Sequence, residues 1–140
     1  MSTITLTSKS IDILEQILAV PDPKPAEQWL WRKSGSGYED PQPLKSIGEL
    51  RDLISALPLK SFLIVAHHSQ PGLFTQCART GDRFRTECSV PTGDGNDVHT
   101  FADDDGLLSM ALCQTVMGAY VQSNGRLPHL DGYDTEVMHF

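Results

Sequence analysis

The chain has 140 residues, of which 39% are hydrophobic and 21% are charged, and its formal net charge is −7. This length and composition are typical of a globular protein with a proper core, so we expect a single domain over residues 1–140. The negative charge argues against nucleic acid as a partner, because proteins that bind a phosphate backbone need a cationic surface.

Targeting signals and cysteine usage favour the cytoplasm. The N-terminus lacks the basic flank and apolar core of a signal peptide, and no apolar run is long enough to span a membrane. Cys77, Cys88 and Cys113 lack the spacing of a zinc site, and an odd number argues against a secreted disulfide scaffold. We therefore expect a cytoplasmic protein without membrane contact.

The first 45 residues carry the weakest structural signals. A short edge strand is predicted over 3–7 from a weak alternation of threonine with apolar residues. A helix is predicted to follow the cap Ser10 and to end at Pro21. Residues 34–45 are predicted to be a loop from their content of glycine, serine and proline.

The segment 27–33 supports two interpretations. Alternation of Trp29 and Trp31 suits a strand, whereas Pro25 followed by Ala-Glu-Gln suits the start of a helix, which we favour. The two tryptophans, with Tyr38, suit either a core or an exposed aromatic patch for a partner. The sequence does not separate these two roles.

A capped helix precedes the central part of the chain. Ser46 and Glu49 have the spacing of a capping box, in which each side chain accepts a hydrogen bond from the other residue's amide. Apolar residues then recur at helical spacing, and Pro58 ends the helix. Its buried face is predicted to carry Leu50, Leu53, Ile54 and Leu57.

Three strands are predicted in succession, over Phe62–His67, 73–80 and 83–90. Pro71-Gly72 suits a type II turn, and Gly81-Asp82 suits a tight II′ hairpin turn. The first strand is apolar on both sides, so both faces should be covered. The hairpin fixes the register of the other two, whose buried face should carry Leu73, Thr75, Cys77 and Arg79 with Phe84, Thr86, Cys88 and Val90. The opposite face should be polar and solvated, and it carries Phe74, Gln76, Ala78 and Thr80 with Arg83, Arg85, Glu87 and Ser89.

Downstream of the meander, residues 91–97 are predicted to be a flexible acidic loop and 98–102 a fourth strand. Asp103, Asp104 and Asp105 are predicted to cap a helix that extends to residue 123 and to complement its dipole. Its buried face should carry Leu108, Ala111, Leu112, Val116 and Ala119, its end is signalled by Asn124-Gly125, and Thr135–His139 is a possible last strand.

Together these elements predict an α+β fold. An antiparallel meander of about four to five strands should carry its helices mainly on one face.

Constellations that could carry chemistry are weak. His67 and His68 are adjacent on a strand and should point to opposite faces, and no metal-binding motif is present. The cysteines fall on predicted core positions, which favours buried, unreactive thiols. Residues 93–97 lack the order and the closing glutamate of a calcium loop. We therefore expect no catalytic residue, no bound metal and no cofactor.

The chain resembles the small immunity proteins of bacterial polymorphic toxin systems, over about residues 46–121. The resemblance rests on a capped helix before the sheet, then a strand with Gln76, a turn at Gly81-Asp82, a strand with Glu87, and a later strand and helix. It implies a non-enzymatic protein that neutralises a toxin domain, such as a deaminase or nuclease delivered by contact-dependent or type VI secretion, by covering its active site.

An acidic surface is expected to contact such a toxin, because toxins that act on nucleic acids or nucleotides carry basic clefts. The candidate partner-binding residues are Asp94, Asp97, Asp103, Asp104, Asp105 and Glu87. Two alternatives remain open: a small enzyme or ligand-binding domain that uses His67 and His99, and a structural subunit of a larger assembly.

Overall fold

The computed structural model describes residues 28–34, 41–101, 106–129 and 135–140. They form an α+β fold with two helices and an open, antiparallel sheet of eight strands, more than the four to five predicted. The predicted strand 3–7 and the helix after Ser10 lie outside these residues. The elements are β1 Trp29–Lys33, β2 Gln42–Pro43, α2 Ile47–Ser55, β3 Phe62–His67, β4 Phe74–Thr80, β5 Arg83–Thr92, β6 Gly95–Phe101, β7 Leu108–Ser109, α3 Met110–Gln122 and β8 Thr135–His139.

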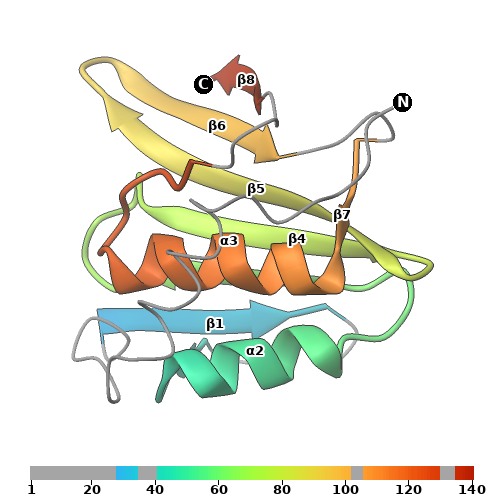
Figure 1. Cartoon of the computed structure of the whole chain (residues 1–140). Coiled ribbons are helices and arrows are strands. Elements are labelled where there is room, and N and C mark those ends of the chain that lie inside the picture. The colour runs from blue at the N-terminus through green and yellow to red at the C-terminus, as the bar shows by residue number, and fades with distance from the viewer. Residues whose placement is uncertain (1–27, 35–40, 102–105, 130–134) are drawn as a thin grey trace.

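The strands follow the order β2-β1-β3-β4-β5-β6-β8, and β7 pairs with the start of β5 beyond the end of β6. Figure 1 shows α2 and α3 beside each other on one side of this sheet. The two described helices therefore cover one face, as predicted, and we call it the covered face. The opposite face is called the open face.

The central meander agrees with the sequence in strand order and register. Thr80 pairs with Arg83 across the two-residue turn, and Gly81 has a φ of 64°, which a II′ turn requires at that position. Phe84 and Cys88 are fully buried, whereas Arg85 is exposed. The predicted alternation is therefore confirmed over residues 84–88. It is wrong at Ser89, which was expected on the polar face and is fully buried, and Arg79 and Val90, expected to be buried, are partly exposed.

Two details of the meander differ from the prediction. The amide of Leu73 donates to the carbonyl of Gln70 at 3.0 Å, so a turn is present, but Gly72 lacks the positive φ of a type II turn. In β3 only one side is fully buried, because Phe62 is exposed and Ile64 and Ala66 are partly exposed on the open face.

The helix favoured over residues 27–33 is wrong, because Trp29–Lys33 forms β1, antiparallel to β3. Main-chain pairing with β3 places Trp29 in the core, where its ring meets Tyr120 edge-on at 5.5 Å between centroids. The predicted loop 34–45 also contains the short strand β2, which pairs with β1. Non-local pairing thus decides a segment whose local signals conflict.

The predicted loop over 91–97 is wrong as well. Strand β5 continues to Thr92 and β6 begins at Gly95, so the two strands form a long hairpin with Gly93 and Asp94 between them. Pro91 faces Asn96 in this ladder. Continuous pairing between β5 and β6 therefore holds this segment in the sheet, although its composition is typical of a loop.

Helix α2 begins at the predicted cap. Ser46 Oγ accepts the amide of Glu49 at 2.9 Å, but the carboxylate of Glu49 accepts the amide of Lys45 at 2.8 Å rather than that of Ser46. Its buried side chains are Ile47, Leu50 and Ile54, and Leu53 is partly buried.

Helix α3 begins later than predicted, because Ser109 is its cap: Ser109 Oγ accepts the amide of Leu112 at 3.2 Å. The caps predicted at Asp103, Asp104 and Asp105 lie outside the described residues. The predicted helical face is wrong at Ala111, which is exposed, whereas Leu112 and Val116 are buried as predicted. Cys113 and Met117, outside the predicted face, are buried as well.

The end of α3 is a Schellman motif, as Asn124-Gly125 suggested. The amide of Asn124 donates to Val121 and that of Gly125 to Tyr120, while Asn124 has a φ of 58° and Gly125 one of 97°. The hydroxyl of Tyr120 also donates to the carbonyl of Ser89, which fixes the helix to β5.

The core lies between the helices and the covered face. Its thiols are buried as predicted: burial raises the pKa of Cys88 to about 12 and raises that of Cys113 well above its ordinary value. Such thiols remain protonated and unreactive at neutral pH.

Candidate functional site

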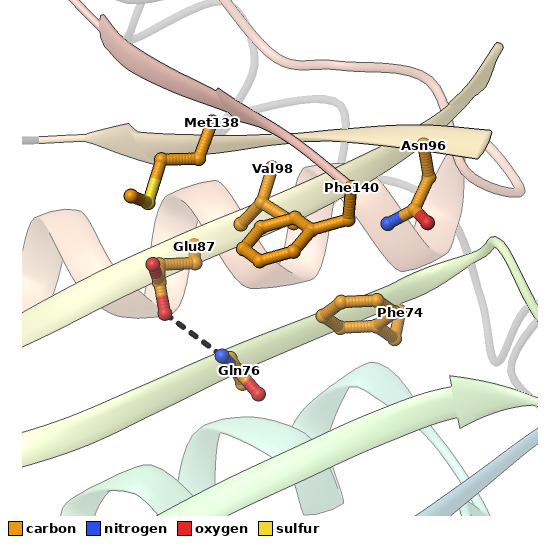
Figure 2. Close-up of a pocket in the computed structure, with 7 residues that line it drawn as sticks. All are labelled: Phe74, Gln76, Glu87, Asn96, Val98, Met138 and Phe140. Carbon is orange, nitrogen blue, oxygen red and sulfur yellow. Dashed lines mark hydrogen bonds between the residues drawn. The ribbon is translucent and has the colours of Figure 1, made fainter. Parts of the chain in front are cut away.

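The open face of the sheet carries a hollow of about 340 Å³ where β4, β5, β6 and the C-terminal segment lie side by side (Figure 2). Its volume lies at the small end of the range for ligand pockets, which begins at roughly 300 Å³. Its lining combines apolar and polar side chains: Phe74, Gln76, Glu87, Asn96, Val98, Met138 and Phe140.

A row of polar side chains crosses three strands at the hollow. Gln76 and Glu87 line the hollow, and Glu87 is the direct cross-strand neighbour of both Gln76 and Thr100. Gln76 Nε2 donates to Glu87 Oε1 at 2.8 Å, and Thr100 Oγ1 donates to Glu87 Oε2 at 3.1 Å. Both carboxylate oxygens are thus held in place, and the Glu87 side chain is only 18% exposed.

The apolar part comes from separate segments. Phe74 stands on β4 and Val98 on β6, while Met138 on β8 and Phe140 just beyond it form the outer wall. Figure 2 shows the rings of Phe74 and Phe140 next to each other, with Gln76 and Glu87 to one side of them. Met138 and Phe140 are 60% and 66% exposed. Large apolar side chains this exposed commonly mark an interaction site when they cluster.

Main-chain contacts hold the outer wall in position. Asn96 and Phe140 exchange two backbone hydrogen bonds, of 3.1 and 2.9 Å. A Cβ on Gly95 would lie 1.9 Å from the carbonyl oxygen of Phe140, so this close approach requires glycine. Asn96 Nδ2 donates to Ser89 Oγ at 2.8 Å, which orients the amide that lines the hollow.

One cation stands near the carboxylate. Arg85 Nε is 3.8 Å from Glu87 Oε2, beyond hydrogen-bond distance, and the Arg85 side chain is 52% exposed. An ion pair of this length and exposure is weak. Glu87 therefore remains able to accept further hydrogen bonds from a donor that enters the hollow.

The lining of the hollow provides one carboxylate, two amides and several apolar side chains. Among the described residues that line it, Glu87 is the one ionisable side chain. A carboxylate between aromatic and aliphatic groups can hold a donor-bearing group with an apolar stem. Nucleophilic catalysis would need a nucleophile paired with a base, and the lining supplies no such pair.

The predicted acidic residues do not gather on one surface. Glu87 lies in the hollow, but Asp97 points to the other face of β6, since it alternates with the lining residues Asn96 and Val98. Asp97 Oδ1 is 2.6 Å and Asp94 Oδ1 is 3.3 Å from the two ring nitrogens of His139. Both aspartates thus contact the last strand. Asp103, Asp104 and Asp105 lie outside the described part of the chain.

The histidines proposed for an enzyme do not meet. His67 on β3 and His99 on β6 are separated by β4 and β5, a span of roughly 14 Å at about 4.8 Å per strand. The prediction that His67 and His68 diverge is also wrong, because their rings stack with centroids 4.8 Å apart. His68 follows the end of β3, where strand alternation no longer applies.

His67 is a structural residue at the edge of the core. The amide of Ser69 donates to its Nδ1 at 3.2 Å, so Nε2 carries the proton and lies 3.2 Å from Gln28 Oε1. Burial, followed by the adjacent His68, lowers the pKa of His67 below 6.5. Both effects favour the neutral ring.

Among the residues with described positions, no cluster of three histidine, cysteine, aspartate or glutamate side chains is placed to hold a metal ion. Within the same residues, no helix has the length and apolar character needed to cross a membrane.

Comparison with protein-family models, curated protein sequences and solved structures finds no significant match for this chain. The site is therefore interpreted from its own geometry. Phe74, Asn96, Met138 and Phe140 were not singled out from the sequence. The spacing of Met138 and Phe140, two residues apart, could have indicated that they share one face of the last strand. Their proximity to Glu87, however, depends on the pairing of β8 with β6.

Proposed function

We propose that the chain is a non-enzymatic immunity protein of the cytoplasm, which binds and neutralises a cognate toxin domain through the open face of its sheet. The observation that carries this proposal is the hollow itself. Exposed apolar side chains of Met138 and Phe140 stand there beside the part-buried carboxylate of Glu87. Interfaces combine apolar and aromatic anchors with a few fixed polar groups in this way.

The resemblance to immunity proteins supports the same surface. The two strands that carry the resemblance place Gln76 and Glu87 directly opposite each other, joined by a hydrogen bond of 2.8 Å. The net charge of −7 is also suited to a toxin with a basic cleft. Of the acidic residues considered above, Glu87 is the first candidate for contact, since Asp94 and Asp97 contact His139.

The direct test is to express the toxin domain encoded beside the gene for this chain, with and without the chain. Growth should stop with the toxin alone and recover when both are made, and the two proteins should copurify as a complex. A neighbouring toxin that this chain neither binds nor neutralises would overturn the proposal. So would purified chain that turns over a substrate by itself.

A pair of matched variants locates the surface. Met138→Ala should weaken the complex, whereas Leu59→Ala should not, although both side chains are 60% exposed in the free protein. Leu59 precedes β3 and does not line the hollow. Equal effects of the two substitutions would place the interface elsewhere.

A further inference from the structure

We infer that the hollow receives an arginine side chain of the partner protein, whose guanidinium group binds the Glu87 carboxylate while its stem lies against Phe74 and Phe140. This inference rests on the proposed binding role of the open face and specifies which chemical group anchors there. Its support comes from acceptor capacity, charge and shape, in that order.

The Glu87 carboxylate has unused capacity to accept hydrogen bonds. A carboxylate has about four lone-pair positions, and Glu87 uses two of them for Gln76 and Thr100. The remaining positions can accept N–H groups, and the amide oxygens of Gln76 and Asn96 add further acceptors to the lining. A guanidinium, with five N–H donors and no acceptor, is complementary to such a set.

The charges around the hollow favour a cation. Glu87 lies in a row that continues through Thr100 to Glu136 on β8, so two carboxylates stand in this row, and Arg85 Nε is 3.8 Å from Glu87 Oε2. Arg85 is too far from Glu87 for a hydrogen bond. A cation that enters the hollow can therefore pair with the Glu87 carboxylate. This protein holds that carboxylate in place through hydrogen bonds but does not neutralise it by close contact with a cation.

The shape and aromatic lining of the hollow favour arginine over lysine. Phe74 and Phe140 both line the hollow, and their rings lie next to each other beside Gln76 and Glu87 (Figure 2). A planar guanidinium stacks on aromatic faces and pairs with a carboxylate through two parallel hydrogen bonds, whereas an ammonium is a compact, strongly hydrated charge. The volume of about 340 Å³ suits one side chain rather than a large cofactor.

The test needs no toxin. The ¹⁵N-labelled protein is titrated with Nα-acetyl-arginine amide, and in parallel with the citrulline analogue, which has nearly the same shape but no charge. The arginine probe should produce saturable shifts at the amides of Gln76, Glu87 and Asn96, and the citrulline probe should bind at least about tenfold more weakly. Equal binding of both probes, or shifts elsewhere only, would overturn the inference.

Three charge variants sharpen the test, because their effects differ in sign. Glu87→Gln should weaken binding of the arginine probe by about tenfold or more, and Arg85→Gln should strengthen it. Glu136→Gln is the matched control: it removes the same charge from the same row, but outside the lining, and should change affinity by less than about twofold. Equal losses for Glu87→Gln and Glu136→Gln would show non-specific attraction.

The two proposals can fail separately. If the toxin binds and Glu87→Gln leaves its affinity unchanged, the arginine anchor is wrong and the immunity role stands. If the arginine probe binds as expected but no toxin does, the immunity role is wrong. If purified protein self-associates and the Glu87→Gln variant does not, the occupant is a second copy of this chain, which overturns the commitment to a different partner.

Discussion

The two faces of the sheet are made by the same strands, yet they differ in what backs them. On the covered face, Leu63, Cys77 and Phe84 are at most 2% exposed because α2 and α3 pack on them. On the open face, apolar side chains remain accessible and surround a carboxylate fixed by hydrogen bonds. Strand alternation separates the two sets of residues, but the helices decide which set becomes core.

The largest expected difference between the faces is in stability. Phe84→Ala should lower the free energy of unfolding by about 3–5 kcal/mol, because it leaves a cavity in the core. Phe140→Ala should change it by no more than about 0.5 kcal/mol, because its side chain is 66% exposed. Urea denaturation of the two variants makes the comparison. Similar losses would mean that the open face contributes to the core.

A smaller effect is expected where the open face is assembled. Gly95→Ala should cost about 1–3 kcal/mol through the clash with the Phe140 carbonyl, and amide hydrogen exchange at Asn96 should accelerate. Gly93→Ala, in the same hairpin, meets no atom within 4 Å and serves as the control. Unchanged exchange in Gly95→Ala would show that the C-terminal segment does not depend on this close approach.

The helices that cover the other face depend on their caps. Ser46→Ala should lower the free energy of unfolding by about 0.5–2 kcal/mol, because the amide of Glu49 loses its acceptor. Thermal and urea melts would measure this loss. Binding of the arginine probe should remain unchanged, since Ser46 serves only the covered side; a changed affinity would indicate that the faces are coupled.

The smallest expected effect is a pH dependence at the edge of the covered face. The pKa of His67 is lowered in the folded protein, whereas the unfolded chain takes up a proton near pH 6.5. The contribution to stability is therefore retained above about pH 6.5 and lost as the pH falls toward the folded pKa. His67→Gln should flatten the pH dependence of the melting temperature between about pH 5 and pH 8. An unchanged pH dependence in His67→Gln would mean that His67 does not cause it.

Local sequence signals predicted the parts of the fold that local geometry controls. The turn at Gly81, the register that buries Phe84 and Cys88, and the end of α3 at Asn124 follow from backbone preferences and alternation. Trp29 was misassigned because its strand forms only through pairing with β3, far along the chain. The segment 91–97 was misassigned because glycine and proline obscured a hairpin that β8 also stabilises.

The candidate site was predictable only in its polar part. Glu87 was expected on an accessible polar face, and Gln76 was expected opposite it from the hairpin register. The apolar wall was not predictable, because Phe140 reaches the hollow through the pairing of β8 with β6. No spacing within the sequence specifies which strand of a sheet a distant C-terminal strand will join.

The position of β8 at the end of the strand order affects how readily this strand opens. Among the described strands, β8 pairs with β6 alone, so it can detach by local opening without global unfolding, at a lower free energy than the core. Each opening would remove Met138 and Phe140 and leave Phe74 and Val98 with the polar side chains of the hollow. A bound partner would then slow hydrogen exchange along β8 more than anywhere in the core, so that one measurement reports occupancy of the hollow and closure of its wall together.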